Sequence, residues 1–216
     1  MSLLGGLHWL GHASFRLETD DLTVYIDPWK LVRPQPAEGV LVTHGHRDHL
    51  SPEDLAEIVG PETTVVIAAP YVDELPRELE GEVLGISAGE TLTVRGLRIE
   101  AVPSYNTKKP NHPRDHGNVG YVIEIDGRRI YHAGDTDLIP EMSDIECDVA
   151  LLPMGGTYTM NADEAAQAAA RMRPKVVVPM HWGGIVGTRE DVERFDTRVD
   201  ELTGGEVSVV VMQLEA

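Results

Sequence analysis

The sequence predicts an α/β sandwich, in one domain spanning residues 1–216. Its first half carries many short apolar runs separated by turn residues, which is typical of strands. Its second half alternates such runs with helical patterns. This order favours layers of sheet and helix over a barrel or a helical bundle. A chain of 216 residues is most simply one large domain.

The first half is predicted to form eight strands, at 7–10, 14–17, 23–26, 40–43, 64–68, 82–86, 91–94 and 97–102. Two helices are expected between them, at 52–59 and 72–80. Ser51 and Pro52 supply the N-cap and first-turn signals of the earlier helix. The clearest hairpin pairs 119–125 with 128–133, because Asp126-Gly127 favours the turn whose twist matches paired strands.

Buried strands are predicted next at 149–152 and 175–179. Asn161 and Glu164 have the spacing of a capping box and begin an alanine-rich helix that runs to about residue 172. A last helix is expected at 189–202 and a terminal strand at 207–212. The longest segment without predicted structure is 104–118, and loops of that length are usually functional or mobile.

The chain is strongly acidic, with 36 acids against 18 bases and a formal net charge of -18. Such a field repels nucleic acids and anionic membranes, so neither is an expected partner. Cys147 is the one cysteine, which excludes an intramolecular disulfide and fits a reducing compartment. Residues 1–6 lack signal-peptide features, and no apolar run approaches the ~20 residues of a membrane span. A cytoplasmic protein is therefore expected.

Four potential metal ligands follow the apolar run 39–42, namely His44, His46, Asp48 and His49. In an extended chain, residues at i, i+2 and i+4 face the same way, so His44, His46 and Asp48 are expected to converge. His49 would face the opposite side of an extended chain. A turn would have to bring it round, which suits a second, neighbouring metal. The loop lies between a strand and a helix, where open α/β proteins commonly place their sites.

Other strand ends also carry residues able to bind metal. Asp27, Asp135 and His181 each follow a predicted strand, and the 104–118 loop adds His112 and His116. Imidazole and carboxylate ligands without a thiolate favour zinc, manganese or iron.

The ordered motifs resemble the metallo-β-lactamase-fold hydrolases, and among them the branch that includes the ascorbate-6-phosphate lactonase and many uncharacterised metal-dependent hydrolases. The resembling stretches are 9–15, 26–28, 43–49, 131–137, 152–156 and 179–181. The resemblance implies a four-layer αββα sandwich with a dinuclear metal site at the strand-end edge of its two sheets.

The resemblance also implies the ligands of two divalent ions, zinc being expected and manganese or iron the alternatives. His44 and His46 would bind the first ion, Asp48, His49 and His181 the second, and Asp135 both. The family has one more histidine on the first ion, at a place matching 102–105, where this chain has none. His112 is the expected replacement. His116, or a site with fewer ligands or one metal, are the alternatives.

Further roles are assigned to residues around these ligands. Asp27 is expected to orient the histidine loop, and His132 either supports the ligands or belongs only to its hairpin. The resemblance also implies that Asp48 orients the nucleophile, although as a metal ligand it cannot act as a free base. Proton delivery to the leaving group is left open between water, His12 and His116. His12 is a candidate to contact substrate or to support the ligands, and is otherwise a buried core histidine.

His116 and Tyr158 are expected to contact substrate, although a simple turn before the capped helix explains the 155–158 segment equally well. The predicted activity is hydrolysis of a small ester-like bond, in a lactone or a phosphodiester, by a metal-bound hydroxide. The substrate is expected to be a small anionic metabolite. The alternatives are a catalytically silent metal-binding regulator or scaffold, and a di-iron redox protein. Assembly into a homo-oligomer is compatible with these features.

Overall fold

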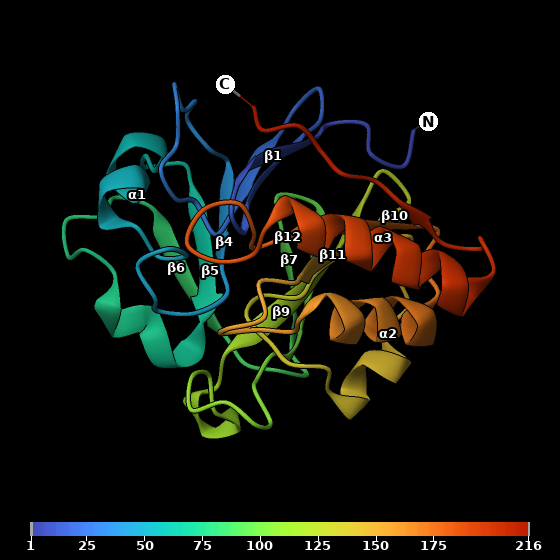
Figure 1. Cartoon of the computed structure of the whole chain (residues 1–216). Coiled ribbons are helices and arrows are strands. Elements are labelled where there is room, and N and C mark those ends of the chain that lie inside the picture. The colour runs from blue at the N-terminus through green and yellow to red at the C-terminus, as the bar shows by residue number, and fades with distance from the viewer. Residues whose placement is uncertain (1, 216) are drawn as a thin grey trace.

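Two mixed β-sheets pack face to face in the computed structural model, which describes residues 2–215 (Figure 1). The first sheet has six strands in sequence order. They are β1 (Leu7–Gly11), β2 (Ser14–Glu18), β3 (Thr23–Ile26), β4 (Gly39–Val42), β5 (Thr64–Ala68) and β6 (Glu82–Ile86). Strands β1 to β3 are antiparallel, and β3 to β6 are parallel.

The second sheet has seven strands in the order β13-β12-β11-β10-β9-β8-β7. They are β7 (Thr91–Val94), β8 (Leu97–Pro103), β9 (Val119–Ile125), β10 (Arg128–His132), β11 (Val149–Pro153), β12 (Val176–Met180) and β13 (Ser208–Val209). Strands β7 to β10 are antiparallel, whereas β10 to β13 are parallel.

Alternating side chains of β4 divide the apolar interior into two regions. Leu41 points between the two sheets, while Val40 and Val42 point to the outer face of the first sheet. There they pack with Leu55 and Ile58 of helix α1 (Pro52–Ile58). Because both faces of this strand are covered, its sequence is continuously apolar.

Helices α2 (Ala162–Met172) and α3 (Arg189–Thr203) cover the second sheet, on the side of the molecule opposite to α1 (Figure 1). A capping box formed by Asn161 and Glu164 begins α2, as the sequence predicts. The buried face of α2 is made of alanines, and α3 packs Phe195 and Val199 into the same core. The predicted four-layer αββα sandwich is therefore confirmed.

Two local predictions are wrong. Residues 72–80 do not form an α-helix. The start of the segment belongs to the 3-10 turn η1 (Ala69–Glu74), which ends just before Pro76, a residue without the backbone N–H that a continuing helix needs. The terminal strand is limited to β13, since pairing with β12 stops after Val209. Two further 3-10 turns are η2 (Arg114–His116) and η3 (Pro140–Asp144). Within residues 2–215, no helix combines the length and apolar character that crossing a membrane requires.

The strand directions bring five chain segments to one edge of the sandwich. Strands β1, β3 and β4 run the same way and end just before His12, Asp27 and His44. Strands β10 and β12 are both parallel to β11 and end before Asp135 and His181. Residues far apart in the sequence can therefore meet at this edge.

Candidate metal centre

The loop after β4 turns immediately and is not extended. The backbone N–H groups of His49 and Leu50 both donate to the carbonyl oxygen of His46, at 2.9 and 2.7 Å. The prediction that His44, His46 and Asp48 converge on one point is therefore wrong. The turn places Asp48 with His49 in one ligand group and leaves His44 and His46 in another, while His44 also forms a third possible group with His49 and Asp135.

The first group consists of His44, His46 and His112. The Nδ1 atom of His46 lies 3.1 Å from Nε2 of His44 and 2.9 Å from Nε2 of His112. His44 and His112 are buried, and His46 is exposed. The long loop after β8 thus delivers a histidine to the place where the strand end itself has none.

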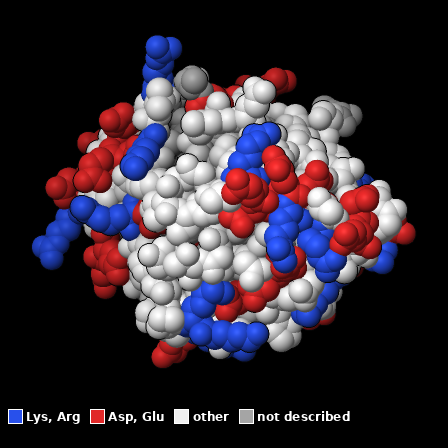
Figure 2. All heavy atoms as spheres, viewed as in Figure 1, with Lys and Arg blue, Asp and Glu red and all other residues white. Residues whose placement is uncertain are grey.

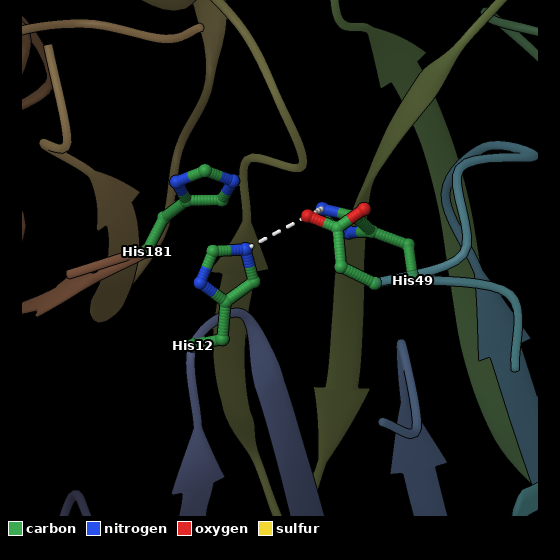
Figure 3. A group of neighbouring side chains, drawn as sticks. His12, His49 and His181 are labelled. Atoms are coloured by element: carbon green, nitrogen blue, oxygen red, sulfur yellow. Dashed lines mark hydrogen bonds and ion pairs between the residues drawn. The ribbon is translucent and has the colours of Figure 1, made fainter. Parts of the chain in front are cut away.

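The second group consists of His12, Asp48, His49 and His181, which come from the segments after β1, β4 and β12 (Figure 3). The Nε2 atom of His12 lies 3.0 Å from Oδ2 of Asp48. The rings of His12 and His181 have centroids 3.8 Å apart, and the backbone N–H of His181 donates to the carbonyl oxygen of His12. His12 is therefore a member of this group, a position that its sequence context did not predict.

Asp135 lies between the two groups and is almost fully buried. Its Oδ2 is 3.4 Å from Nε2 of His112 and 3.2 Å from Nε2 of His181. Its Oδ1 is 3.3 Å from Nε2 of His49. One carboxylate therefore faces ligand atoms of both groups.

The separations of 2.9 to 3.4 Å are compatible with metal ligands as well as with hydrogen bonds. Two nitrogens bound tetrahedrally to zinc at about 2.0–2.1 Å lie roughly 3.3 Å apart. Moreover, Nε2 of His49, both ring nitrogens of His181 and Oδ1 of Asp135 are buried without a hydrogen-bond partner. Leaving such atoms unpaired is costly, and a shared cation would satisfy them. The residues at this edge thus fit a metal-binding centre.

Asp27 orients two of the histidines from a fully buried position. Its Oδ2 accepts hydrogen bonds from Nδ1 of His49 and from the Thr43 hydroxyl, both at 2.7 Å, and its Oδ1 accepts from the Thr43 backbone N–H. The Thr43 hydroxyl lies 3.0 Å from Nδ1 of His44. In both rings Nδ1 is thereby engaged and Nε2 is left as the ligand atom. Thr43 was assigned no role from the sequence, although its position directly before the histidine motif could have indicated one.

His132 is fully buried and is satisfied within the fold. Its Nε2 donates to the carbonyl oxygen of Ala13 at 2.8 Å, and its Nδ1 accepts from the backbone N–H of Gly134 at 3.2 Å. Gly134 has φ +62° and is closely surrounded, so a side chain there would be strained. His132 therefore supports the turn that presents Asp135 and is absent from the two ligand groups.

Four residues of the site have left-handed backbone conformations. His12, Asp27, His112 and His181 have φ between 48° and 58°, a region that non-glycine residues seldom adopt. Residues held in this way cluster at functional sites, where the surrounding structure imposes the conformation.

Burial leaves several of the histidines neutral. It lowers the pKa of His44 well below its usual value, and the nearby charge of His49 adds to this effect. Burial likewise lowers the pKa of His12 and of His112. A neutral imidazole keeps the lone pair that a metal needs.

The carboxylates of the site remain ionised. Burial acts to raise the pKa of Asp135, but His181 and His49 outweigh it and hold that pKa well below its ordinary value. For Asp48, burial also acts to raise the pKa, but the hydrogen bond from His12 and the charge of His49 lower it overall. Burial acts to lower the pKa of His49, yet Asp135 and Asp27 raise it well above the usual value. The carboxylates thus favour positive charge at the centre.

A cavity of about 320 Å³ opens over the ligands, and Tyr158 and Ile185 line it together with His46, Asp48 and His112. His116 is exposed on η2 and is absent from this lining and from both ligand groups. Its predicted contact with substrate therefore has no support in the described contacts.

The loop that carries His112 is held by side chains that the sequence did not single out. The Nδ2 of Asn106 donates to the carbonyl oxygens of Asn111 and Tyr158, at 2.8 and 2.7 Å. Asp137 accepts from the backbone N–H of Thr107 and pairs with Lys109. These anchors explain how a loop brings a histidine to the metal centre.

Known proteins match the chain over most of its length. The family model of the Beta-lactamase superfamily domain matches residues 6–181. A UPF0173 metal-dependent hydrolase from Methanopyrus kandleri is 36% identical over 95% of this chain and 95% of the relative. Another from Thermoplasma acidophilum is 36% identical over 87% of each chain.

Solved structures agree with these matches. A protein from Parabacteroides distasonis, assigned as a metal-dependent hydrolase, superposes with a TM-score of 0.84 and 32% identity, covering 97% of this chain and 93% of that one. Igni18, a metallo hydrolase from Ignicoccus hospitalis, gives a TM-score of 0.80 and 29% identity over 97% and 95% of the chains. The class is thus that of the metallo-β-lactamase fold. Within it, the chain belongs to the UPF0173 family of metal-dependent hydrolases.

Proposed function

We propose that this metal-dependent hydrolase uses a dinuclear centre, with zinc as the preferred metal, to cleave a small ester-like bond. The observation that carries the proposal is the position of Asp135. Its carboxylate faces His112 of the first ligand group and both His49 and His181 of the second. A single carboxylate between two sets of imidazoles supports a pair of ions that would share it.

Two divalent ions at this centre would polarise a carbonyl or phosphoryl oxygen and acidify a water molecule. His44, His46 and His112 would hold the first ion, and Asp48, His49 and His181 the second. Asp27 and Thr43 engage the Nδ1 atoms of His49 and His44, which leaves Nε2 of each ring as the nitrogen that would bind an ion. This preorganisation allows the centre to form without rearrangement of the rings.

Asp48 and His12 are the residues that we assign to positioning and proton transfer. They are joined at 3.0 Å between Oδ2 and Nε2. Asp48 lines the cavity over the ligands, and His12 lines a second cavity beside it. Asp48 would orient the attacking water, and His12 would hold the proton that the leaving group receives.

The substrate is proposed to be a lactone or a small phosphodiester with a negative charge, handled in the cytoplasm. The acidic chain disfavours long polyanions, whereas ions at the centre would still attract one small anionic group.

The test combines metal analysis with panels of lactones and phosphodiesters. Wild-type protein is expected to bind two metal ions per chain and to hydrolyse one panel. His181→Ala should reduce turnover by about a hundredfold or more, because it removes a proposed metal ligand that lies next to Asp135. His8→Ala is a matched control, since His8 is partly exposed and pairs with Glu18 and Glu215.

Activity retained by His181→Ala would refute the assignment of the centre. Two bound ions with no turnover on either panel would instead favour a silent metal-binding protein.

A further inference from the structure

An aromatic cavity of about 510 Å³ lies beside the metal centre. Its walls include Trp9, Trp29 and Trp182, which are all three tryptophans of the chain. They come from β1, from the loop after β3 and from the loop after β12. Three segments far apart in the sequence thus contribute one large aromatic side chain each. Its volume is within the range of small-molecule sites.

The cavity presents carbon atoms to whatever enters it. The indole N–H of Trp9 donates to the carbonyl oxygen of His12 at 3.0 Å, and that of Trp182 donates to the carbonyl oxygen of Pro179 at 3.1 Å. The two indole rings stack with centroids 5.3 Å apart. Because these N–H groups are already satisfied by the backbone, the rings offer apolar faces.

The rim of the cavity concentrates exposed apolar side chains. Val32, Ile185 and Leu214 line it and are 65%, 53% and 59% exposed. Six large hydrophobic residues are exposed in the described chain, and half of them gather here. Figure 2 shows that the middle of this face, around the loop after β12, has few charged side chains. A clustered apolar surface of this kind marks a binding site.

The charged residues of the lining are already engaged. The Lys30 ammonium lies 4.1 Å from the centroid of the Trp29 ring, and Glu215 pairs with Arg16 and His8. This leaves the tryptophan faces and the apolar rim as the surface that selects a ligand.

Two residues link the cavity to the metal centre. The ring of His12 lines the cavity, lies 5.1 Å from the ring of Trp29, and reaches Asp48 through its Nε2 (Figure 3). Ile185 lines both this cavity and the smaller one over the ligands. A molecule whose reacting bond lies at the ligands would therefore place the adjoining group among the tryptophans.

We infer that this cavity binds an apolar alkyl, acyl or aryl group of the substrate, next to the bond that is cleaved. This inference rests on the proposed hydrolysis, and it deepens it by naming the substrate class: an amphiphilic ester with its polar end at the metal centre.

Tryptophan fluorescence provides a direct test, because every tryptophan lines the cavity. Metal-loaded protein is titrated with cyclopentanone and with 2-pentylcyclopentanone, which share a neutral ring and cannot be hydrolysed. The pentyl compound should give a saturable change. Its Kd should fall about three- to fourfold for each added carbon, compared with the unsubstituted ring.

Two leucines give a matched pair of variants. Leu214→Asp places a charge at the rim and should weaken binding of the pentyl compound at least tenfold. Leu202→Asp makes the same change on α3, where Leu202 is 38% exposed and outside the cavity, and should leave Kd unchanged. Ile185→Asp is a second rim variant, expected to act as Leu214→Asp does.

Equal Kd values for the two ketones, or equal effects of Leu214→Asp and Leu202→Asp, would overturn the inference. A dimer that buries the tryptophans and dissociates on dilution, seen by sedimentation, would also overturn it, since a second chain would then occupy the cavity. Binding is measured without turnover. If the pentyl group strengthens binding but no panel is hydrolysed, only the proposed activity is refuted. If a panel is hydrolysed but the pentyl group does not strengthen binding, only this inference is refuted.

Discussion

The substitution Asp27→Asn tests whether the hydrogen bond from His49 to Asp27 orients that histidine for metal binding. Asp27 is fully buried and accepts three hydrogen bonds, from the backbone N–H and hydroxyl of Thr43 and from Nδ1 of His49. An asparagine retains one acceptor oxygen but presents an amide NH₂ on the other side. His49 must then either lose its partner or move its proton to Nε2, which is the atom that faces Asp135.

The expected cost follows from these contacts. Loss of a residue that orients a metal-binding histidine typically weakens metal binding about 10- to 100-fold, or about 1.4–2.7 kcal/mol. The metal-free protein should also lose roughly 1.5–3 kcal/mol of stability, because one hydrogen bond to a buried charge is removed. For a chain of this size, that loss corresponds to a Tm lower by about 3–12 °C.

The assay is a zinc titration against a competing chelator, with thermal unfolding of the metal-free protein measured in parallel. Asp148→Asn is the matched control, since Asp148 accepts hydrogen bonds from the Arg129 backbone and from Lys175 and from none of the metal-binding histidines. If Asp27→Asn binds zinc within threefold of wild type, Asp27 does not set the tautomer of His49 and the reasoning is wrong.

Three further predictions concern single side chains. His112→Ala should reduce bound metal from two ions to one by elemental analysis, while His116→Ala should retain both; the reverse pattern would exchange their roles. Asp137→Asn should speed amide exchange in 104–118 and weaken metal binding severalfold, because the loop loses its anchor; unchanged exchange would contradict this. Burial raises the pKa of the Cys147 thiol to about 12, so its alkylation at pH 8 should be about a thousandfold slower than that of free cysteine and should rise tenfold per pH unit. Rapid modification of the folded protein would show an ionised thiol instead.

Much of the fold was predictable because its signals are local. Apolar runs predicted the strands of both sheets. The capping box of Asn161 and Glu164 and the pair Ser51-Pro52 predicted the starts of two helices. The predicted helix at 72–80 was wrong: the 3-10 turn η1 ends at Glu74, and Pro76 lacks the backbone N–H that a continuing helix needs. Prediction also failed in the motif itself, where a hydrogen-bonded turn at His46 replaced the extended chain. A single domain and the lactonase branch stay predictions.

The sequence by itself determined the class of protein and the types of ligand. The order of histidines and aspartates at strand ends is written in the chain, and strand direction carries them to one edge. Only the tertiary structure decided which of them meet. It brought His112 to His46 through a loop fixed by Asn106, and it placed His12 against Asp48. It also gathered three tryptophans into one cavity beside the centre. Such contacts join residues far apart in the sequence, and long-range packing leaves no local pattern from which they could be read.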